Sequence, residues 1–251
     1  MRVDVLLGEA RVAPADVADR VVIVIDVLRA SSTAAIALAN GARALIPCAS
    51  IEEAEQRANE QRAKGMNDAV RLGGERRMMR IPGFDFGNSP LEYTAEQVAD
   101  KTIVFTTTNG TRALAASVGA PACYFGGFVN AAATVSAVKR ASNGVTDIAI
   151  VCAGTEGRVA LEDVTCAGRL ARLLLAESPD ATHSDAAHLA LLCERPYAHD
   201  PALLARDATH ARSLAVAGFA DDVSACLALD TAPVAVEYRD GHLRAVGAGR
   251  A

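Results

Sequence analysis

Short apolar runs alternate along the chain with polar loops and Ala/Leu-rich stretches. The pattern recurs in four units, at residues 21–41, 102–119, 122–142 and 148–177. Each unit begins with a β-branched run typical of a fully buried strand and continues with a stretch of helical composition. Buried strands that alternate with helices predict an α/β fold, namely a three-layer α/β/α domain with a mainly parallel or mixed central sheet built from strand-loop-helix units.

The remaining stretches add helices and a hairpin. Residues 51–64 have the pattern of a helix, with Ser50 and Glu53 spaced as a capping box. Beyond residue 177 the pattern weakens, and we expect a surface loop, further helices and a final hairpin that turns at Asp240-Gly241. The predicted C-terminal helices lie near residues 185–193, 201–216 and 220–228. We expect a single domain over residues 1–251, with a sub-lobe from about residue 178 as the alternative.

Composition narrows the classes of protein. The chain has 251 residues, enough to bury a full core, and that core must consist of Ala, Val, Leu and Ile because aromatic residues make up only 4% and Trp is absent. The net charge is −5 and no block of Lys or Arg could neutralise a run of phosphates, so we expect no nucleic-acid partner.

The cellular setting follows from the cysteines and the apolar runs. Six Cys are scattered singly through apolar segments, which favours free thiols in a reducing compartment. The apolar run at 21–28 is too short to span a bilayer, and the N-terminal residues lack a signal-peptide pattern. We therefore expect a cytoplasmic protein without a membrane partner. The number of subunits stays open, with a homodimer as one option.

Polar residues follow directly after the predicted strands. In an open parallel sheet the ligand crevice lies outside the carboxyl ends of the strands, and helices that begin there favour anions through their free N–H groups. These residues comprise Asp26, Arg29, Ser31, Ser32 and Thr33, then Thr106 to Thr111 around Asn109-Gly110, then Gly154 to Gly157 with Glu162 and Asp163 close behind.

Most of these positions also have a purely structural explanation. Ser31, Ser32 and Thr111 are ordinary helix N-cap types, and Asn109-Gly110 suits a turn with positive φ. Asp26 differs, because a carboxylate at the end of the run VVIVI should be partly buried. It needs a partner such as Arg29 or a metal ion.

The segment GGERRMMRIPGFDFGNSPLEYT, residues 73–94, is too long and too rich in Gly for a simple connection. Ser89, Pro90 and Glu92 fit a helix start with a capping box. Three polar residues of the segment, Glu75, Asp85 and Asn88, have no such explanation and are candidates for a site.

The acidic residues near predicted strand ends suggest a hard cation. They are Asp26, Glu75, Asp85, Glu162 and Asp163. No His lies nearby in the sequence, since the five His are all at position 183 or later and have no zinc-binding spacing. Oxygen ligands alone suit Mg²⁺, which takes one or two carboxylates together with water and phosphate oxygens. The metal candidates are Asp26, Glu75, Asp85 and Glu162.

Sequence patterns of three kinds of phosphate-binding or phosphatase chemistry are absent or incomplete in this chain. No Walker-type loop is present. Asp26 has the strand-end position of an aspartyl nucleophile, but Leu28 stands where those phosphatases carry a second Asp. The stretch CAGTEGR, from Cys152 to Arg158, has the Cys-x5-Arg spacing of thiolate phosphatases, although Val151 and Val159 depart from their pattern.

Four blocks in this order, VIDVLRASST, GERRMMRIPGFDFGNSP, TTNGTRAL and CAGTEGRVALEDVTCAG, resemble the 2-phosphosulfolactate phosphatase family, and the tail SLAVAGFADDVSACLALDTAPVA is similar as well. The resemblance implies an α/β/α fold and a Mg²⁺-dependent phosphatase. Such an enzyme hydrolyses 2-phosphosulfolactate, a small anionic phosphorylated substrate, to sulfolactate and phosphate, a step of coenzyme M synthesis in methanogens. A related phosphorylated acid is the alternative substrate.

The resemblance also points to individual residues. It implies Asp26, Glu75, Asp85, Glu162 and Asp163 as acidic site residues, and Arg29, Ser31, Asn88, Ser89, Asn109, Gly110, Thr111, Gly154 and Thr155 as residues in contact with the ligand. On this basis we expect Asp26, Glu162, Asp163 and Arg29 to be catalytic and the remaining ligand contacts, together with Ser32 and Arg76, to bind the substrate. One departure is that Arg77 and Met78 stand where small glycines are expected. The rival class is a binding protein for a phosphorylated or sulfonated acid, which would need anion sites but not the surplus carboxylates.

Overall fold

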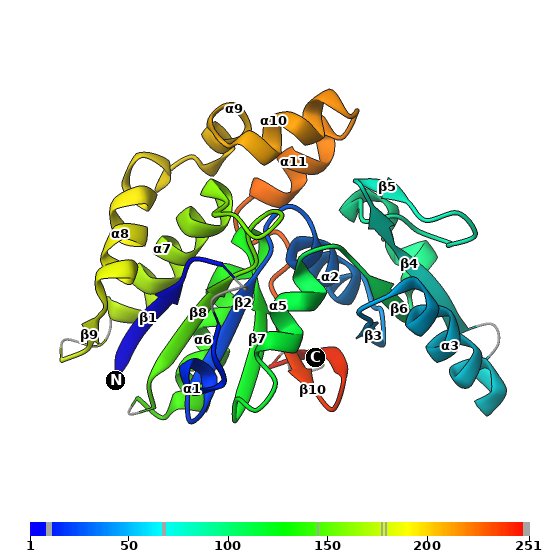
Figure 1. Ribbon diagram of the computed structural model, residues 1–251, viewed down its shortest axis with the longest axis horizontal. Helices are drawn as coiled ribbons and strands as arrows, with labels where there is room; N and C mark the ends of the chain where they lie inside the picture. Colours follow the sequence, from blue (N-terminus) through cyan, green and yellow to red (C-terminus); the bar gives the residue numbers. More distant parts are fainter. Residues whose placement is uncertain (9–11, 67–68, 145, 177, 179, 248–251) are drawn as a thin grey trace.

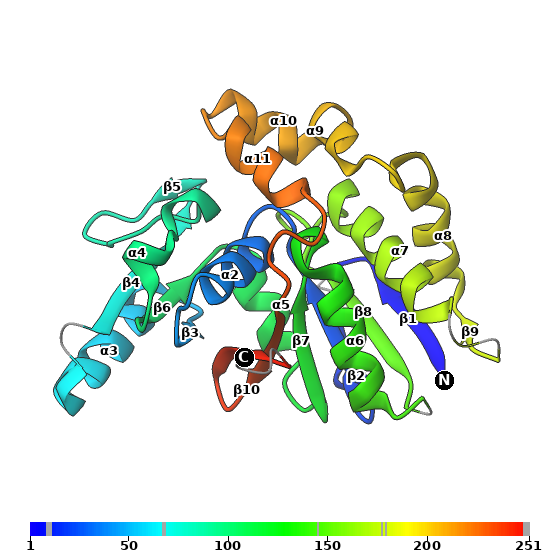
Figure 2. The same cartoon turned by 180° about the vertical axis from the view of Figure 1, so that it is seen from behind.

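The apolar runs form one mixed sheet in the computed structural model, which describes residues 1–8, 12–66, 69–144, 146–176, 178 and 180–247. The strand order is β5-β4-β6-β3-β11-β10-β7-β2-β8-β1-β9. Helices cover both faces of this sheet (Figures 1 and 2), so the predicted α/β/α architecture is confirmed. The strand bounds are β1 Arg2–Leu6, β2 Val21–Ile25, β3 Ala44–Pro47, β4 Val70–Arg76, β5 Met79–Arg80, β6 Thr102–Thr106, β7 Ala122–Gly126, β8 Ile148–Cys152, β9 Thr182–His183, β10 Ala235–Arg239 and β11 His242–Val246.

Parallel pairs dominate the sheet. Strand β2 lies between β7 and β8, with Ile23 opposite Tyr124 on one side and Ile150 on the other. The hairpin β10–β11 is inserted antiparallel between β7 and β3. Because both faces are covered by helices, β2, β6 and β8 are buried along their whole length. The unbroken apolar sequences of β2 and β8 predict this burial.

Alternate residues of each strand face opposite layers. Ile23 and Ile150 belong to the core beneath α6 and α7, whereas Val22 and Val151 belong to the core shared with α2 and α5. The α-helix bounds are α1 Pro14–Val17, α2 Ala30–Ala39, α3 Ile51–Gln61, α4 Ala95–Val98, α5 Gly110–Ala116, α6 Ala131–Ser142, α7 Leu161–Leu175, α8 Asp185–Glu194, α9 Leu204–Asp207, α10 Thr209–Val216 and α11 Ala220–Leu227. No helix in these ranges has the length and apolar character needed to cross a bilayer.

Several local predictions are confirmed. The Ser50 hydroxyl accepts the Glu53 N–H at 3.1 Å as predicted, although the Glu53 carboxylate accepts the N–H of Ala49 instead of that of Ser50, so only half of the predicted capping box forms. The turn at Asp240-Gly241 joins β10 to β11. The predicted helix 201–216 is divided into a 3-10 turn, α9 and α10, because the backbone becomes extended at Ala208. Helices α9 to α11 lie above the carboxyl ends of the central strands (Figure 1).

The capping box predicted at Ser89 is wrong. Residues Pro90–Glu92 form only one 3-10 turn, and the Ser89 side chain caps no backbone N–H. Its hydroxyl instead donates to Asp222 Oδ1 at 2.6 Å, in α11. The Glu92 carboxylate accepts the Gly87 N–H at 2.6 Å. A long-range side-chain contact therefore replaces the local cap.

We predict that Gly168→Ala lowers the free energy of unfolding by about 1–3 kcal/mol. Gly168 lies in α7 where α8 packs against it, and an added Cβ would collide with the carbonyl oxygen of Ala190. Gly8→Ala is the control, because a Cβ there meets no heavy atom of the described residues within 4 Å. Chemical denaturation of both variants measures the change, and an equal loss in both would show that the α7–α8 contact is not the cause.

Candidate active site

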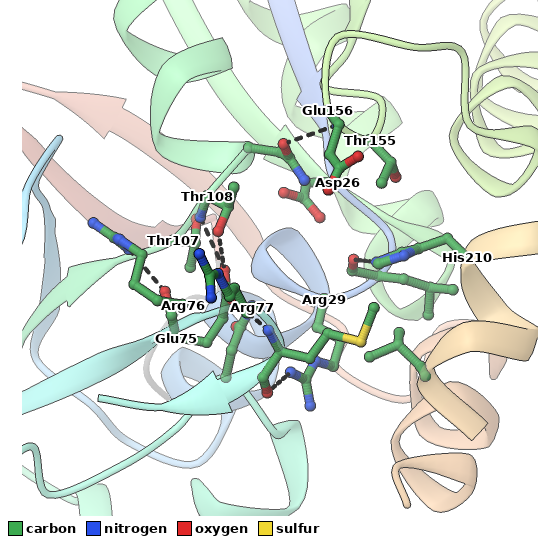
Figure 3. A pocket seen from close by; sticks show the side chains of 15 residues that line it. Asp26, Arg29, Glu75, Arg76, Arg77, Thr107, Thr108, Thr155, Glu156 and His210 are labelled. Carbon is green, nitrogen blue, oxygen red and sulfur yellow. Dashed lines mark hydrogen bonds between the residues drawn. The ribbon is translucent and has the colours of Figure 1, made fainter. Parts of the chain in front are cut away.

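A pocket of about 430 Å³ lies at the carboxyl ends of the strands (Figure 3). Its walls come from the loops after β2, β6 and β8, from the β4–β5 turn and from α10. The lining residues are Asp26, Leu28, Arg29, Glu75, Arg76, Arg77, Met78, Asn88, Thr107, Thr108, Asn109, Thr155, Glu156, His210 and Leu214. The loops after parallel strands thus meet where the sheet topology predicts a ligand crevice.

Asp26 is a buried acid at the end of a central strand. It follows β2, and its Oδ1 accepts the Ala30 N–H at 3.3 Å. The first residue of α5, Gly110, approaches so closely that an added Cβ would lie 2.8 Å from Asp26 Oδ2. Glycine is needed at position 110 because any side chain there would displace the carboxylate.

Asp163 lies behind Asp26 and joins two loops. Its Oδ1 accepts the Val27 N–H and its Oδ2 accepts the Gly154 N–H, both at 2.9 Å. The neighbouring Glu162 is buried, and its Oε2 has no hydrogen-bond partner among the described residues. Both acids occupy the first turn of α7, and neither lines the pocket.

Burial makes this acid cluster retain protons. Burial, and after it the charge of the nearby Asp163, raise the pKa of Asp26 to about 8. Burial also raises the pKa of Asp163 to about 8, with Glu162 as the next contributor, and the pKa of Glu162 to about 7. Three carboxylates so close together and so dry do not all ionise near neutral pH.

Glu75 has a structural role in the pocket wall. Its Oε1 accepts both the N–H and the hydroxyl of Thr108 at 2.9 Å, and its Oε2 accepts the Met78 N–H at 2.9 Å. The carboxylate therefore ties the β4–β5 turn to the loop after β6. The adjacent Arg76 donates to Glu75 O at 2.7 Å and to Thr106 Oγ1 at 2.9 Å.

Arg29 is held by the C-terminal helix rather than by Asp26. Its guanidinium donates to Asp222 Oδ2 at 2.5 Å and to Met78 O at 2.8 Å, and it lies 4.4 Å from the centre of the Phe219 ring. Asp222 also accepts the Ser89 hydroxyl, so it bridges two predicted site residues. The sequence around Asp222 gives no sign of this role, because an acid in the first turn of a helix is common.

His210 corrects the expectation that no His is near the site. Helix α10 brings it to the pocket, where Nε2 lies 3.1 Å from Leu28 O. A carbonyl only accepts, so Nε2 carries the hydrogen. Burial lowers the pKa of His210, which keeps its imidazole neutral near pH 7. The sequence does not predict this position, because His210 is far along the chain from the other pocket residues and reaches the site only through the packing of α10.

Seven of the predicted site residues line the pocket: Asp26, Arg29, Glu75, Arg76, Asn88, Asn109 and Thr155. Nine do not: Ser31, Ser32, Asp85, Ser89, Gly110, Thr111, Gly154, Glu162 and Asp163. The Ser31 and Ser32 hydroxyls donate to the carbonyls of Asp26 and Val27. Asp85 is exposed and accepts the Leu72 N–H at 2.8 Å, which fixes its loop rather than a pocket wall.

Cys152 ends β8 and is completely buried in the core. It does not line the pocket, and burial raises the pKa of its thiol well above the usual value. A thiolate nucleophile needs the opposite environment, a lowered pKa and access to solvent. The geometry thus favours carboxylate chemistry over the Cys-x5-Arg alternative.

The pocket offers few free oxygen ligands for Mg²⁺. In the described parts of the chain, no three His, Cys, Asp or Glu side chains are grouped to hold a metal ion. Of the three carboxylates that line the pocket, those of Asp26, Glu75 and Glu156, the Glu75 carboxylate already accepts protein hydrogen bonds with both oxygens. In the same lining, the buried Asn88 Oδ1 and Thr107 Oγ1 have no partner among the described residues. Such a sparse oxygen set fits Mg²⁺ that is held mostly by water and substrate phosphate.

Fold and pocket together define a three-layer α/β/α protein with acidic and basic side chains at the carboxyl ends of its strands. The sequence model of the family described as 2-phosphosulpholactate phosphatase matches residues 8–241. The chain therefore belongs to the 2-phosphosulpholactate phosphatase family, a family of phosphoric monoester hydrolases.

Individual relatives agree with this assignment. A protein of Symbiobacterium thermophilum is 38% identical over 228 residues, covering 91% of this chain and 95% of its own length. One of Caldicellulosiruptor saccharolyticus is 37% identical over 224 residues, covering 88% and 90%. One of Clostridium beijerinckii is 34% identical over 245 residues, covering 97% and 99%. Each of the three is named "Probable 2-phosphosulfolactate phosphatase".

We predict that the metal-free protein loses stability as the pH rises from about 4.5 to about 8. In the folded state the acid cluster keeps protons up to pH 7–8, whereas an unfolded Asp with a pKa of 3.8 has already released its proton. The folded state thus binds more protons across this window. Each such proton lowers the free energy of unfolding by about 1.4 kcal/mol per pH unit.

Thermal unfolding in EDTA at several pH values measures this slope. Glu162→Gln should flatten it, because one titrating group and its repulsion of Asp163 are removed. Glu96→Gln is the matched control, since Glu96 is exposed in α4. Parallel stability curves for the wild type and Glu162→Gln would contradict the prediction.

Proposed function

We propose that this protein hydrolyses the phosphate monoester of 2-phosphosulfolactate, or of a closely related phosphorylated acid, to sulfolactate and phosphate with Mg²⁺ as cofactor. The observation that carries the proposal is the buried Asp26 carboxylate, which opens into a pocket lined by three arginines. The family and the names of the relatives supply the substrate class.

Asp26 is the residue that we assign to the reacting phosphate. Its Oδ1 accepts the Ala30 N–H, and Gly110 leaves room for its Oδ2. Asp163 acts behind it as a positioning residue, because it fixes the loops after β2 and β8 and does not line the pocket. Glu162 also lies outside the pocket lining and acts on this cluster through its charge next to Asp163. The carboxylate that meets the substrate is thus held in place by backbone contacts.

We assign Mg²⁺ to Asp26, with the side-chain oxygens of Asn88 and Thr107 nearby in the pocket lining. The bound cation would polarise the phosphoryl group and stabilise the leaving oxygen. Glu75 is a weaker candidate, since both of its carboxylate oxygens already accept hydrogen bonds from the protein. Asp85 lies outside the pocket lining.

The charges of the pocket favour an enzyme over a binding protein. Asp26, Glu75 and Glu156 all line it. An acid at the pocket accepts a phosphorylated acid beside it only if it keeps its proton or if a cation lies between the two, and a protein that only binds the anion has no use for a buried Asp26. A metal-dependent hydrolase explains both the acids and the arginines.

We predict that Asp26→Asn lowers kcat at least about 100-fold, because a group in contact with the reacting phosphate is lost. Release of phosphate from 2-phosphosulfolactate with Mg²⁺ measures the effect. Asp221→Asn is the matched control, because Asp221 is exposed in α11 and lies outside the pocket lining. Wild-type turnover by Asp26→Asn would overturn the proposal.

Chelation separates the remaining alternatives. EDTA should abolish hydrolysis and Mg²⁺ should restore it, whereas Cys152→Ser should keep its activity. Full activity in EDTA together with loss of activity in Cys152→Ser would instead establish the thiolate mechanism. Tight binding of 2-phosphosulfolactate without any hydrolysis would establish the binding protein.

A further inference from the structure

The turn between β4 and β5 has an unusual backbone. Arg76 pairs with Met79, so Arg77 and Met78 form a two-residue hairpin loop. Both have positive φ, 53° and 70°, in the left-handed region. This conformation suits Gly and Asn, and a long side chain there costs free energy. Strain of this kind persists only where the surroundings enforce it.

Two buried charged side chains fix this turn. Glu75 accepts the Met78 N–H at 2.9 Å, and Arg29 donates to Met78 O at 2.8 Å. Each of these residues is itself anchored, Glu75 to Thr108 and Arg29 to Asp222. The turn is therefore attached to the loop after β6 on one side and to α11 on the other.

The clamped turn presents Arg77 to the pocket. Arg77 lines the pocket, and Figure 3 shows it on the wall opposite His210. The guanidinium groups of Arg29 and Arg76 already donate to protein acceptors. Arg77 has no hydrogen-bond or ion-pair partner within the described part of the chain. It is thus the arginine of this wall whose donors remain available to a ligand.

We propose that Arg77 is a specificity residue that binds the second anionic group of the substrate, a carboxylate or sulfonate, and so selects phosphorylated acids over neutral phosphate esters. The inference rests on the proposed function and extends it to a residue. Planar guanidinium donors match the paired oxygens of either group. With the phosphate assigned to Asp26 and its cation, the other anionic group needs a separate positive partner.

Three phosphate esters test this selectivity: 2-phosphosulfolactate, 2-phospholactate without the sulfonate, and glycerol 2-phosphate without either acid group. Arg77→Gln should raise KM for 2-phosphosulfolactate about 10- to 100-fold, the effect of losing a hydrogen bond to a charged group. The preference for this ester over glycerol 2-phosphate should fall by a similar factor. The change in kcat should be much smaller than the change in KM.

Two further variants separate the guanidinium from the turn. Arg77→Gly suits the positive φ and removes only the side chain, so it should behave like Arg77→Gln. Arg80→Gln removes a charge from the same hairpin outside the pocket lining and should keep the wild-type preference. The inference is overturned if Arg77→Gly keeps the wild-type preference, or if all three esters are affected equally.

The 2-phospholactate arm identifies the bound group. An equal rise of KM for both acid esters assigns Arg77 to the carboxylate, and a rise confined to 2-phosphosulfolactate assigns it to the sulfonate. Either result supports the inference. An unchanged KM for both esters overturns it.

Binding of sulfolactate, which carries both acid groups but no phosphate, separates this inference from the proposed function. Calorimetry should show at least about tenfold weaker binding to Arg77→Gln than to the wild type. If the wild type hydrolyses none of the esters, the proposed function fails while this measurement still decides the role of Arg77. Equal affinity, or no sulfolactate binding to the wild type, overturns the inference.

Discussion

The site depends on one buried carboxylate that never reaches the pocket. Asp163 accepts backbone N–H groups from Val27 and Gly154, and these two residues follow neighbouring strands of the sheet. Loss of this carboxylate would leave a buried N–H unpaired on each loop. The position of Asp26, one residue before Val27, therefore depends on an acid that reaches it across the sheet.

Two further acids, Glu75 and Asp222, fix the backbone on the opposite wall in the same way. Glu75 holds the β4–β5 turn to the loop after β6, and Asp222 holds Arg29 and Ser89 to α11. The acids that the sequence suggests as a metal cluster thus divide by task. Asp26 faces the pocket, while the others mainly fix the backbone around it. This division explains why so many carboxylates gather without forming a group of metal ligands in the described residues.

The sequence predicts the parts of this structure that local patterns determine. Unbroken apolar runs marked β2 and β8, and Asp240-Gly241 marked the hairpin, because burial and turn geometry act over a few residues. It also predicted that Asp26 would be buried. The Arg29–Asp222 pair could not be predicted from local patterns, since the two residues lie 193 positions apart and meet only through the packing of α11. His210 was missed for the same reason, and Asp85 was misjudged because its acceptor role toward Leu72 depends on the course of the loop.

Burial also changes how the charge of the pocket should be counted. If every carboxyl group is counted as ionised, the acids at and behind the pocket make it strongly negative. Burial, however, raises the pKa of Asp26 and Asp163 to about 8, so these acids hold protons near neutral pH. The pocket therefore repels an anion less than the sequence suggests. Arg77 adds positive charge at the β4–β5 turn. A cation bound at Asp26 would favour the ionised carboxylate and release its proton. Binding of cation and anion is thereby coupled to proton release, which gives an acid-rich pocket a physical means of accepting a phosphorylated acid.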